Sequence, residues 1–90
     1  MAQHKTNSLS DEDLLYKIEA LDDRQVLVLT TDDQVVIDGL TSDLPPDSAA
    51  WACKGGGVAF VKCTKKIVDS SGCAIVVPHG DGYCSKPCRD

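Results

Sequence analysis

Residues 24–40 have the sequence RQVLVLTTDDQVVIDGL, in which two runs of aliphatic and β-branched residues enclose a polar turn at Asp32-Asp33. β-Branched residues favour extended backbone, and two such runs around a short turn predict an antiparallel hairpin. The first run is apolar on both faces, so we expect its strand to lie at the centre of a sheet or beneath a helix. The rest of the fold is built around this hairpin.

Upstream of the hairpin, residues 9–22 have the pattern of a short helix. Ser10 is a favourable N-cap, and the three acidic residues after it occupy the first turn, where the helix dipole favours negative charge. Apolar residues recur at helical spacing and would face the core: Leu14, Ile18 and Leu21. We expect a helix of about three turns that ends near Asp22-Asp23.

Downstream, Pro45-Pro46 interrupts regular structure, and Gly55-Gly56-Gly57 indicates a flexible joint. Residues 58–63 and 73–77 are rich in β-branched residues, and we expect two further strands there, the second one stopped by Pro78. The predicted fold class is α+β: a short N-terminal helix followed by a small antiparallel β-sheet, with a cysteine-rich C-terminal half.

Charge divides the chain into two segments. Residues 1–48 form an acidic segment of helix and β-hairpin, with eleven acidic and three basic side chains. Residues 49–90 form a cationic, Gly- and Cys-rich segment, with six basic and three acidic side chains and all five cysteines. Such an asymmetry, together with a shift in composition, suggests that the two segments have different roles.

No arrangement of residues indicates catalysis, and we expect that the protein is not an enzyme. The histidines are His4, near the N-terminus, and His79, in a Pro-His-Gly turn; His79 could serve Cys73 or Cys84 as a base, but the sequence indicates no third group that would orient it. The N-terminus lacks the apolar stretch of a secretory signal peptide, so we expect synthesis in the cytoplasm and a dedicated route for any export of the C-terminal part.

The five cysteines are candidates for crosslinks or for metal ligation. Disulfides, a zinc site of four cysteines or of three cysteines with His79, and reduced buried thiols all remain open, and the odd number leaves one cysteine outside any set of intrachain pairs. No cofactor other than this zinc is expected. The candidate residues are Cys53, Cys63, Cys73, Cys84 and Cys88.

The layout resembles that of ribosomally synthesised, post-translationally modified peptide precursors, in which an acidic leader precedes a Cys-rich core. Residues 9–14, LSDEDL, look like the leader stretches of that class. The resemblance implies a processing enzyme as partner and an antimicrobial or signalling C-terminal product, whose positive charge suits anionic membranes. Thioether crosslinking would modify hydroxyls among the cysteines: Thr64, Ser70, Ser71 and Ser85.

A rival resemblance is to the Sm-like fold, an N-terminal helix followed by a strongly bent antiparallel barrel. Residues 24–40 look like its first motif, and residues 75–81 lie where the second belongs. This resemblance implies an intracellular binding module for RNA or a protein, with a basic patch of Lys62, Lys65 and Lys66 available to phosphates. A third hypothesis is a small Cys-ligated metal-binding regulator.

Overall fold

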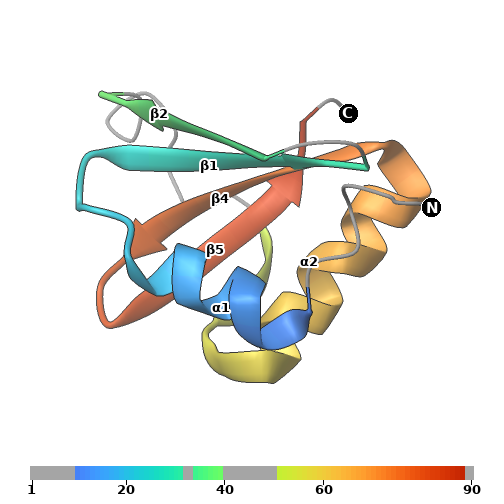
Figure 1. Cartoon of the computed structure of the whole chain (residues 1–90), viewed down its shortest axis with the longest axis horizontal. Coiled ribbons are helices and arrows are strands. Elements are labelled where there is room, and N and C mark those ends of the chain that lie inside the picture. The colour runs from blue at the N-terminus through green and yellow to red at the C-terminus, as the bar shows by residue number, and fades with distance from the viewer. Residues whose placement is uncertain (1–9, 32–33, 40–50, 89–90) are drawn as a thin grey trace, which may run out of the picture.

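The computed structural model describes residues 10–31, 34–39 and 51–88. These residues form two helices and one five-stranded antiparallel sheet, which confirms the predicted α+β class. The elements in chain order are α1 (Asp11–Glu19), β1 (Gln25–Thr30), β2 (Gln34–Asp38), β3 (Ala52–Gly55), α2 (Gly57–Ser71), β4 (Cys73–His79) and β5 (Gly82–Pro87). The strand order is β2-β1-β4-β5-β3, so β2 and β3 are the edges (Figure 1).

Helix α1 begins as its sequence predicts. The Ser10 hydroxyl accepts a hydrogen bond of 3.1 Å from the Asp13 N–H, which satisfies one of the free donors of the first turn. Leu14 and Ile18 are buried, and Leu21 packs against them. The helix ends at Glu19, slightly earlier than expected, and the chain turns through residues 20–24 into β1.

The predicted hairpin is confirmed as β1 and β2, with Leu27 opposite Val36 in their register. The turn at Asp32-Asp33 lies outside the described residues. On its other side β1 pairs with β4, with Leu27 opposite Val76, so β1 is an internal strand covered on both faces. This position explains why consecutive residues of β1, Val26 and Leu27, are both buried.

The strand expected over residues 58–63 is wrong, because this stretch lies in helix α2. Its β-branched residues favour a strand locally, but its buried residues follow helical spacing as far as Val68: Phe60, Val61, Thr64 and Val68. The expected glycine joint is the junction between β3 and this helix. Gly72 ends the helix with a φ of 89°, a left-handed conformation that glycine adopts without steric cost.

Strand β4 continues past Pro78, where we expected it to stop. The ladder with β1 runs from Cys73 to Val76 on the β4 side, so Pro78 pairs with β5 alone, opposite Tyr83. A proline without an N–H is tolerated where one side of the strand needs no donor. A turn at Gly80-Asp81 joins β4 to β5 as a hairpin.

The sheet has an apolar core on each face. Both helices cover one face (Figure 1), and that core includes Leu14, Ile18, Leu27, Phe60 and Val76. The core of the opposite face consists of Val26, Trp51, Val77 and Cys84. Because β1 from the acidic segment lies beside β4 from the cationic segment, the two segments share one sheet.

Two further features bear on the sequence-based expectations. The sheet is open, with two edges, and a 15-residue helix separates β3 from β4, whereas the Sm-like resemblance implies a bent barrel. Neither of the helices that the structure describes has the length and apolar character needed to cross a membrane. The break at Pro45-Pro46 lies outside the described residues.

Candidate functional site

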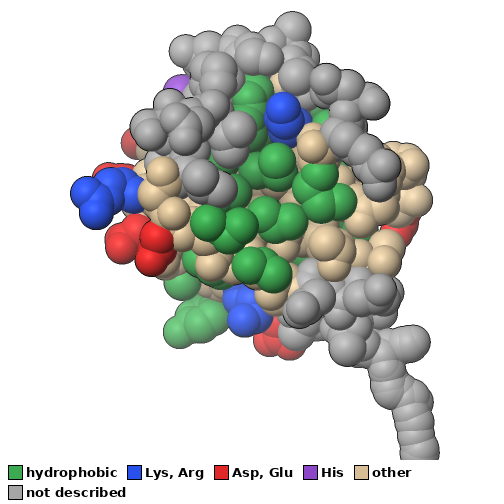
Figure 2. Space-filling model, turned by 90° about the horizontal axis from the view of Figure 1, so that it is seen from above, with side chains coloured by type: hydrophobic (Ala, Val, Ile, Leu, Met, Phe, Trp, Pro, Cys, Tyr) green, Lys and Arg blue, Asp and Glu red, His purple; other side chains and the backbone are tan. Residues whose placement is uncertain are grey.

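The β2 edge, residues Gln34–Asp38, carries apolar side chains in solvent on both faces of the sheet. Val35 is 45% exposed and Val36 is 48% exposed, although they are neighbours in one strand and therefore point in opposite directions. Figure 2 shows the molecule from above, the side on which β2 lies in Figure 1: hydrophobic side chains gather at its centre, a Lys or Arg side chain lies beside them, and other charged side chains lie at the margin. An exposed apolar strand at a sheet edge is a template for pairing with another chain.

An apolar groove of about 500 Å³ lies where α1 meets β2. Its apolar lining comes from Tyr16, Leu21 and Val36, and its rim includes Asp13 and Lys17. Tyr16 is 77% exposed, because α1 turns Leu14 and Ile18 to the core and leaves Tyr16 at the side of the helix. A large aromatic side chain beside an exposed valine is a typical contact surface for an apolar residue of a partner.

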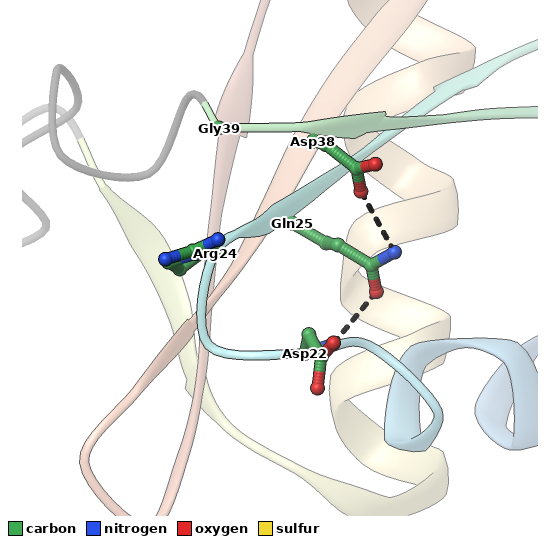
Figure 3. A pocket seen from close by; sticks show the side chains of 5 residues that line it. All are labelled: Asp22, Arg24, Gln25, Asp38 and Gly39. Atoms are coloured by element: carbon green, nitrogen blue, oxygen red, sulfur yellow. Dashed lines mark hydrogen bonds between the residues drawn. The ribbon is translucent and has the colours of Figure 1, made fainter.

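A polar pocket of about 510 Å³ adjoins the groove, at the end of β2 (Figure 3). It is lined by Asp22, Arg24, Gln25, Asp38 and Gly39. The Gln25 side chain lies at its centre: its Oε1 accepts from the Asp22 N–H at 2.7 Å, and its Nε2 donates to Asp38 Oδ1 at 2.9 Å. This amide fixes the end of β2 against the loop after α1 and holds the Asp38 carboxylate in place.

The N-terminal segment, which supplies the lining of the groove and the pocket, is acidic. The described residues 10–31 and 34–39 contain seven acidic side chains and only two basic ones, Lys17 and Arg24. The pocket itself contains the exposed carboxylates of Asp22 and Asp38 and one guanidinium, that of Arg24, so its net charge is negative. This surface therefore attracts a cation and repels a phosphate.

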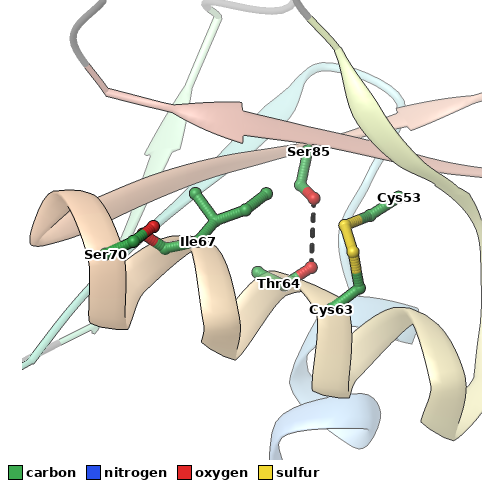
Figure 4. Close-up of a disulfide and its surroundings, with 6 residues drawn as sticks. All are labelled: Cys53, Cys63, Thr64, Ile67, Ser70 and Ser85. Carbon is green, nitrogen blue, oxygen red and sulfur yellow. Dashed lines mark hydrogen bonds between the residues drawn. A yellow bond between two sulfur atoms is a disulfide. The ribbon is translucent and has the colours of Figure 1, made fainter.

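Four of the five candidate cysteines form two disulfides. Cys53–Cys63 joins β3 to α2 (Figure 4), and Cys73–Cys88 joins the start of β4 to the residue after β5. Their Cα–Cα distances, 5.9 and 5.4 Å, are in the usual range for disulfides. The sequence left disulfides, metal ligation and reduced thiols open. In the structure four of the cysteines form disulfides and Cys84 is reduced.

Cys84 takes part in neither disulfide and is 1% exposed, among the residues of the second core. His79 is exposed at the end of β4. The described part of the chain contains no group of three or more histidine, cysteine or acidic side chains that could hold a metal ion. Among the described residues, the six candidate zinc ligands are therefore not gathered at one site. Four of them are cysteines in disulfides, which lack the thiolate that binds zinc.

The hydroxyl candidates for modification occupy different environments. Thr64 and Ser85 are fully buried and hydrogen-bond each other at 3.1 Å between α2 and β5 (Figure 4). Ser70 is exposed and donates to the carbonyl oxygen of Ile67. Ser71 is half-buried, within hydrogen-bond distance of the carbonyl oxygens of Ile67 and Cys73. In the folded protein an enzyme could reach Ser70 but not Thr64 or Ser85.

The predicted basic patch lies on α2. Lys62 and Lys66 are exposed, whereas Lys65 forms an ion pair of 2.8 Å with Asp11 of α1. The hydrogen bond from Lys65 lowers the pKa of Asp11 below its ordinary value of 3.8, and the charges of Lys65 and Lys62 act in the same direction against partial desolvation. One of the three lysines thus contributes to the packing of the two helices.

Tyr83 of β5 lies beneath the helices, with its ring centroid 6.0 Å from that of Phe60. Desolvation raises its pKa above the ordinary value of 10.0, and the Glu19 carboxylate adds to this effect. On the other face, Lys86 lies 5.6 Å from the Trp51 ring centroid, a cation–π contact. These contacts join the C-terminal hairpin to the rest of the fold.

Sequence reasoning placed its candidate site residues in the C-terminal segment and missed the groove and pocket of the N-terminal segment. The signal lay in Val35-Val36-Ile37, because adjacent apolar residues in one strand must leave one side chain on each face. That pattern indicates a binding edge only when the strand is known to be an edge. Comparison with known proteins found no matching family model, curated protein or solved structure.

Proposed function

We propose that this chain is a non-enzymatic protein-binding module, stabilised by disulfides, whose binding surface lies at the α1–β2 side. The single observation that carries the proposal is the exposure of Val35, Val36 and Tyr16 around an edge strand. Tyr16 and Val36 line one groove and Val35 lies on the other face of the same edge strand, and exposed apolar side chains grouped around one strand on a small domain mark an interaction site. The two disulfides favour work in an oxidising environment.

The acidic character of this side supports a protein partner over RNA or an anionic membrane. Phosphate groups require clustered cations, and binding weakens when carboxylates surround the contact surface. The lysines of α2 are on another element, and Lys65 is already paired with Asp11. A partner with a positive charge fits the pocket of Asp22 and Asp38 better.

Photo-crosslinking tests the proposal. A photoreactive amino acid replaces Val36 in the full-length oxidised chain, and a matched control carries it at Val58, which is 42% exposed on α2. In extracts of the native source we expect one protein adduct from position 36, which excess wild-type chain suppresses and Val36→Lys chain does not. Equal labelling from both positions, or no adduct from position 36, would contradict a binding surface at β2.

A second candidate function is a peptide precursor that releases residues 49–90. It is favoured by the placement of both disulfides within residues 51–88, so a released segment keeps its crosslinks. Release would also uncover Val76, which is buried opposite Leu27 of β1. Intact mass of the native protein decides: a chain beginning near Ala49, or one that has lost water from Ser70 or Ser71, supports the precursor, and an unmodified full-length chain excludes it.

A further inference from the structure

The two edges of the sheet are not equivalent. Strand β3 is short, its pairing with β5 is irregular between Ala52 and Gly55, and Cys53 has a φ of 56° and a disulfide to α2. Irregularities of this kind prevent a further strand from pairing. Strand β2 has a regular register with β1 over all its five residues, and its sequence, QVVID, contains no lysine or proline. Among the described strands only β1 pairs with β2.

The groove and the pocket lie on the same face of β2, two residues apart. Val36 is opposite Leu27 and Asp38 is opposite Gln25, and both of these β1 residues point to the helix side. Side chains at positions i and i+2 of a strand share a face, about 7 Å apart. A strand added at the β2 edge would therefore place one side chain beside the apolar groove and the next one on that face beside the polar pocket.

We propose that the β2 edge binds an extended peptide segment of a partner protein as a sixth, antiparallel strand. The segment has a Lys or Arg opposite Asp38 and an apolar residue two positions later, opposite Val36. This inference rests on the proposed function and names its partner class. Backbone hydrogen bonds to β2 supply affinity, and the two side chains supply selectivity, as in other cases of strand addition.

Charge selects a basic segment over a second copy of this chain. The described residues 10–31 and 34–39 contain seven acidic side chains and two basic ones, so two copies joined at β2 would bring acidic surfaces together. A cationic side chain in the pocket meets two carboxylates against the single guanidinium of Arg24, and Gln25 already holds one of these carboxylates, that of Asp38, in position. Complementary charge of this kind raises the association rate and fixes the register.

The test is a binding titration of full-length oxidised protein with synthetic, end-capped peptides, followed by fluorescence anisotropy. The probe is Thr-Lys-Val-Leu-Thr-Val, the first control has the order Leu-Val-Lys in place of Lys-Val-Leu, and the second is the probe with N-methylated backbone. We expect the probe to bind about tenfold more tightly than the reversed order, and the N-methylated peptide not to bind, since it cannot donate to an edge strand.

Variants of the protein locate the site. Val36→Thr and Asp38→Asn should each weaken binding of the probe by about five- to tenfold, because each removes the partner of one side chain. Asp38→Asn keeps an oxygen that can accept from Gln25, so the pocket stays formed. Val58→Thr and Asp69→Asn, exposed positions on α2, are matched controls that should leave binding unchanged.

Four outcomes would overturn this inference. The first is equal affinity for both peptide orders, and the second is unchanged binding by both Val36→Thr and Asp38→Asn. The third is a dimer, detected by sedimentation equilibrium, that Val36→Thr dissociates, which would assign the edge to a second copy. If the peptides fail while crosslinking from position 36 still captures a competed partner, the strand-addition inference is wrong and the proposed function stands.

Discussion

The hydroxyls of Thr64 and Ser85 lie 3.1 Å apart in the core, both fully buried, and join the middle of α2 to β5. A buried hydroxyl without a partner is costly, so each of them depends on the other. Because both hydroxyls are buried in this contact, an enzyme that forms thioethers cannot reach them in the folded protein. A modifying enzyme would have to act on them before the chain folds.

Removal of one hydroxyl should destabilise the protein more than removal of both. Thr64→Val keeps the shape of the side chain but leaves Ser85 without this partner, and we expect a loss of about 1–3 kcal/mol in the free energy of unfolding. The double variant Thr64→Val/Ser85→Ala should recover part of that loss. Urea denaturation measures both values. Simple addition of the two single losses would show that the contact contributes nothing.

Thiol labelling should distinguish one cysteine from the other four. In denaturant without reductant, the chain should take up one alkylating group, at Cys84, and after reduction it should take up five. Mass spectrometry gives the number directly. Uptake of five groups without reductant would show that the disulfides do not form.

Each disulfide should contribute to stability through the unfolded state. The crosslinks close loops with sequence separations of 10 and 15 residues, for which loop entropy predicts about 3 kcal/mol each. Cys73→Ala/Cys88→Ala should lower the free energy of unfolding by this amount, and Cys53→Ala/Cys63→Ala by slightly less. Urea denaturation of the wild type and the two double variants measures these losses. A double variant that unfolds at the same urea concentration as the wild type would contradict the prediction for its disulfide.

The ion pair between Asp11 and Lys65 should make stability depend on acid. The folded protein lowers the pKa of Asp11 below 3.8. The ion pair therefore stabilises the fold fully above pH 3.8, and this stabilisation is lost as the pH falls through the lowered pKa. NMR titration of the carboxyl should show that Lys65→Gln raises the pKa of Asp11. The control is Asp69→Asn, which removes a carboxylate elsewhere on α2 and should leave the titration of Asp11 unchanged.

Tyr83 should resist ionisation at alkaline pH. In a Tyr16→Phe chain it is the only remaining tyrosine, so ultraviolet absorbance of the phenolate follows it alone. We expect a titration midpoint above 10.0, and Glu19→Gln should lower it, because that carboxylate opposes the phenolate charge. Since the folded state holds the proton more tightly, stability is lost as pH rises above the unfolded value near 10. A midpoint at or below 10.0 would contradict this placement.

The sequence predicted the elements whose local preference agrees with their place in the fold. Ser10 has one role, as an N-cap, and the continuous apolar run around Leu27 fits a strand that is covered on both faces. The prediction of a strand over residues 58–63 was wrong because Val58, Phe60 and Val61 favour a strand over a short window. The helical spacing of the apolar residues becomes visible only when Thr64 and Val68 are included.

The candidate site depended on information that a single sequence does not contain. Val36 belongs to a binding edge because β2 is the outermost strand, and strand order results from pairings across the whole chain. Asp38 is presented to a ligand because Gln25 holds it, across the hairpin. The cysteine pairing was likewise open, since five cysteines at these spacings allow many connectivities.

The position of β1 between β2 and β4 has a consequence for biosynthesis. The ribosome releases β1 long before Cys73, the first residue of β4, so the nascent hairpin carries an uncovered apolar strand edge while α2 is still being made. The sheet can therefore be completed only after β4 and β5 have been made, and the Cys73–Cys88 disulfide can close only after Cys88 has been made. Until then the unpaired apolar edge of the emerging hairpin exposes the chain to aggregation.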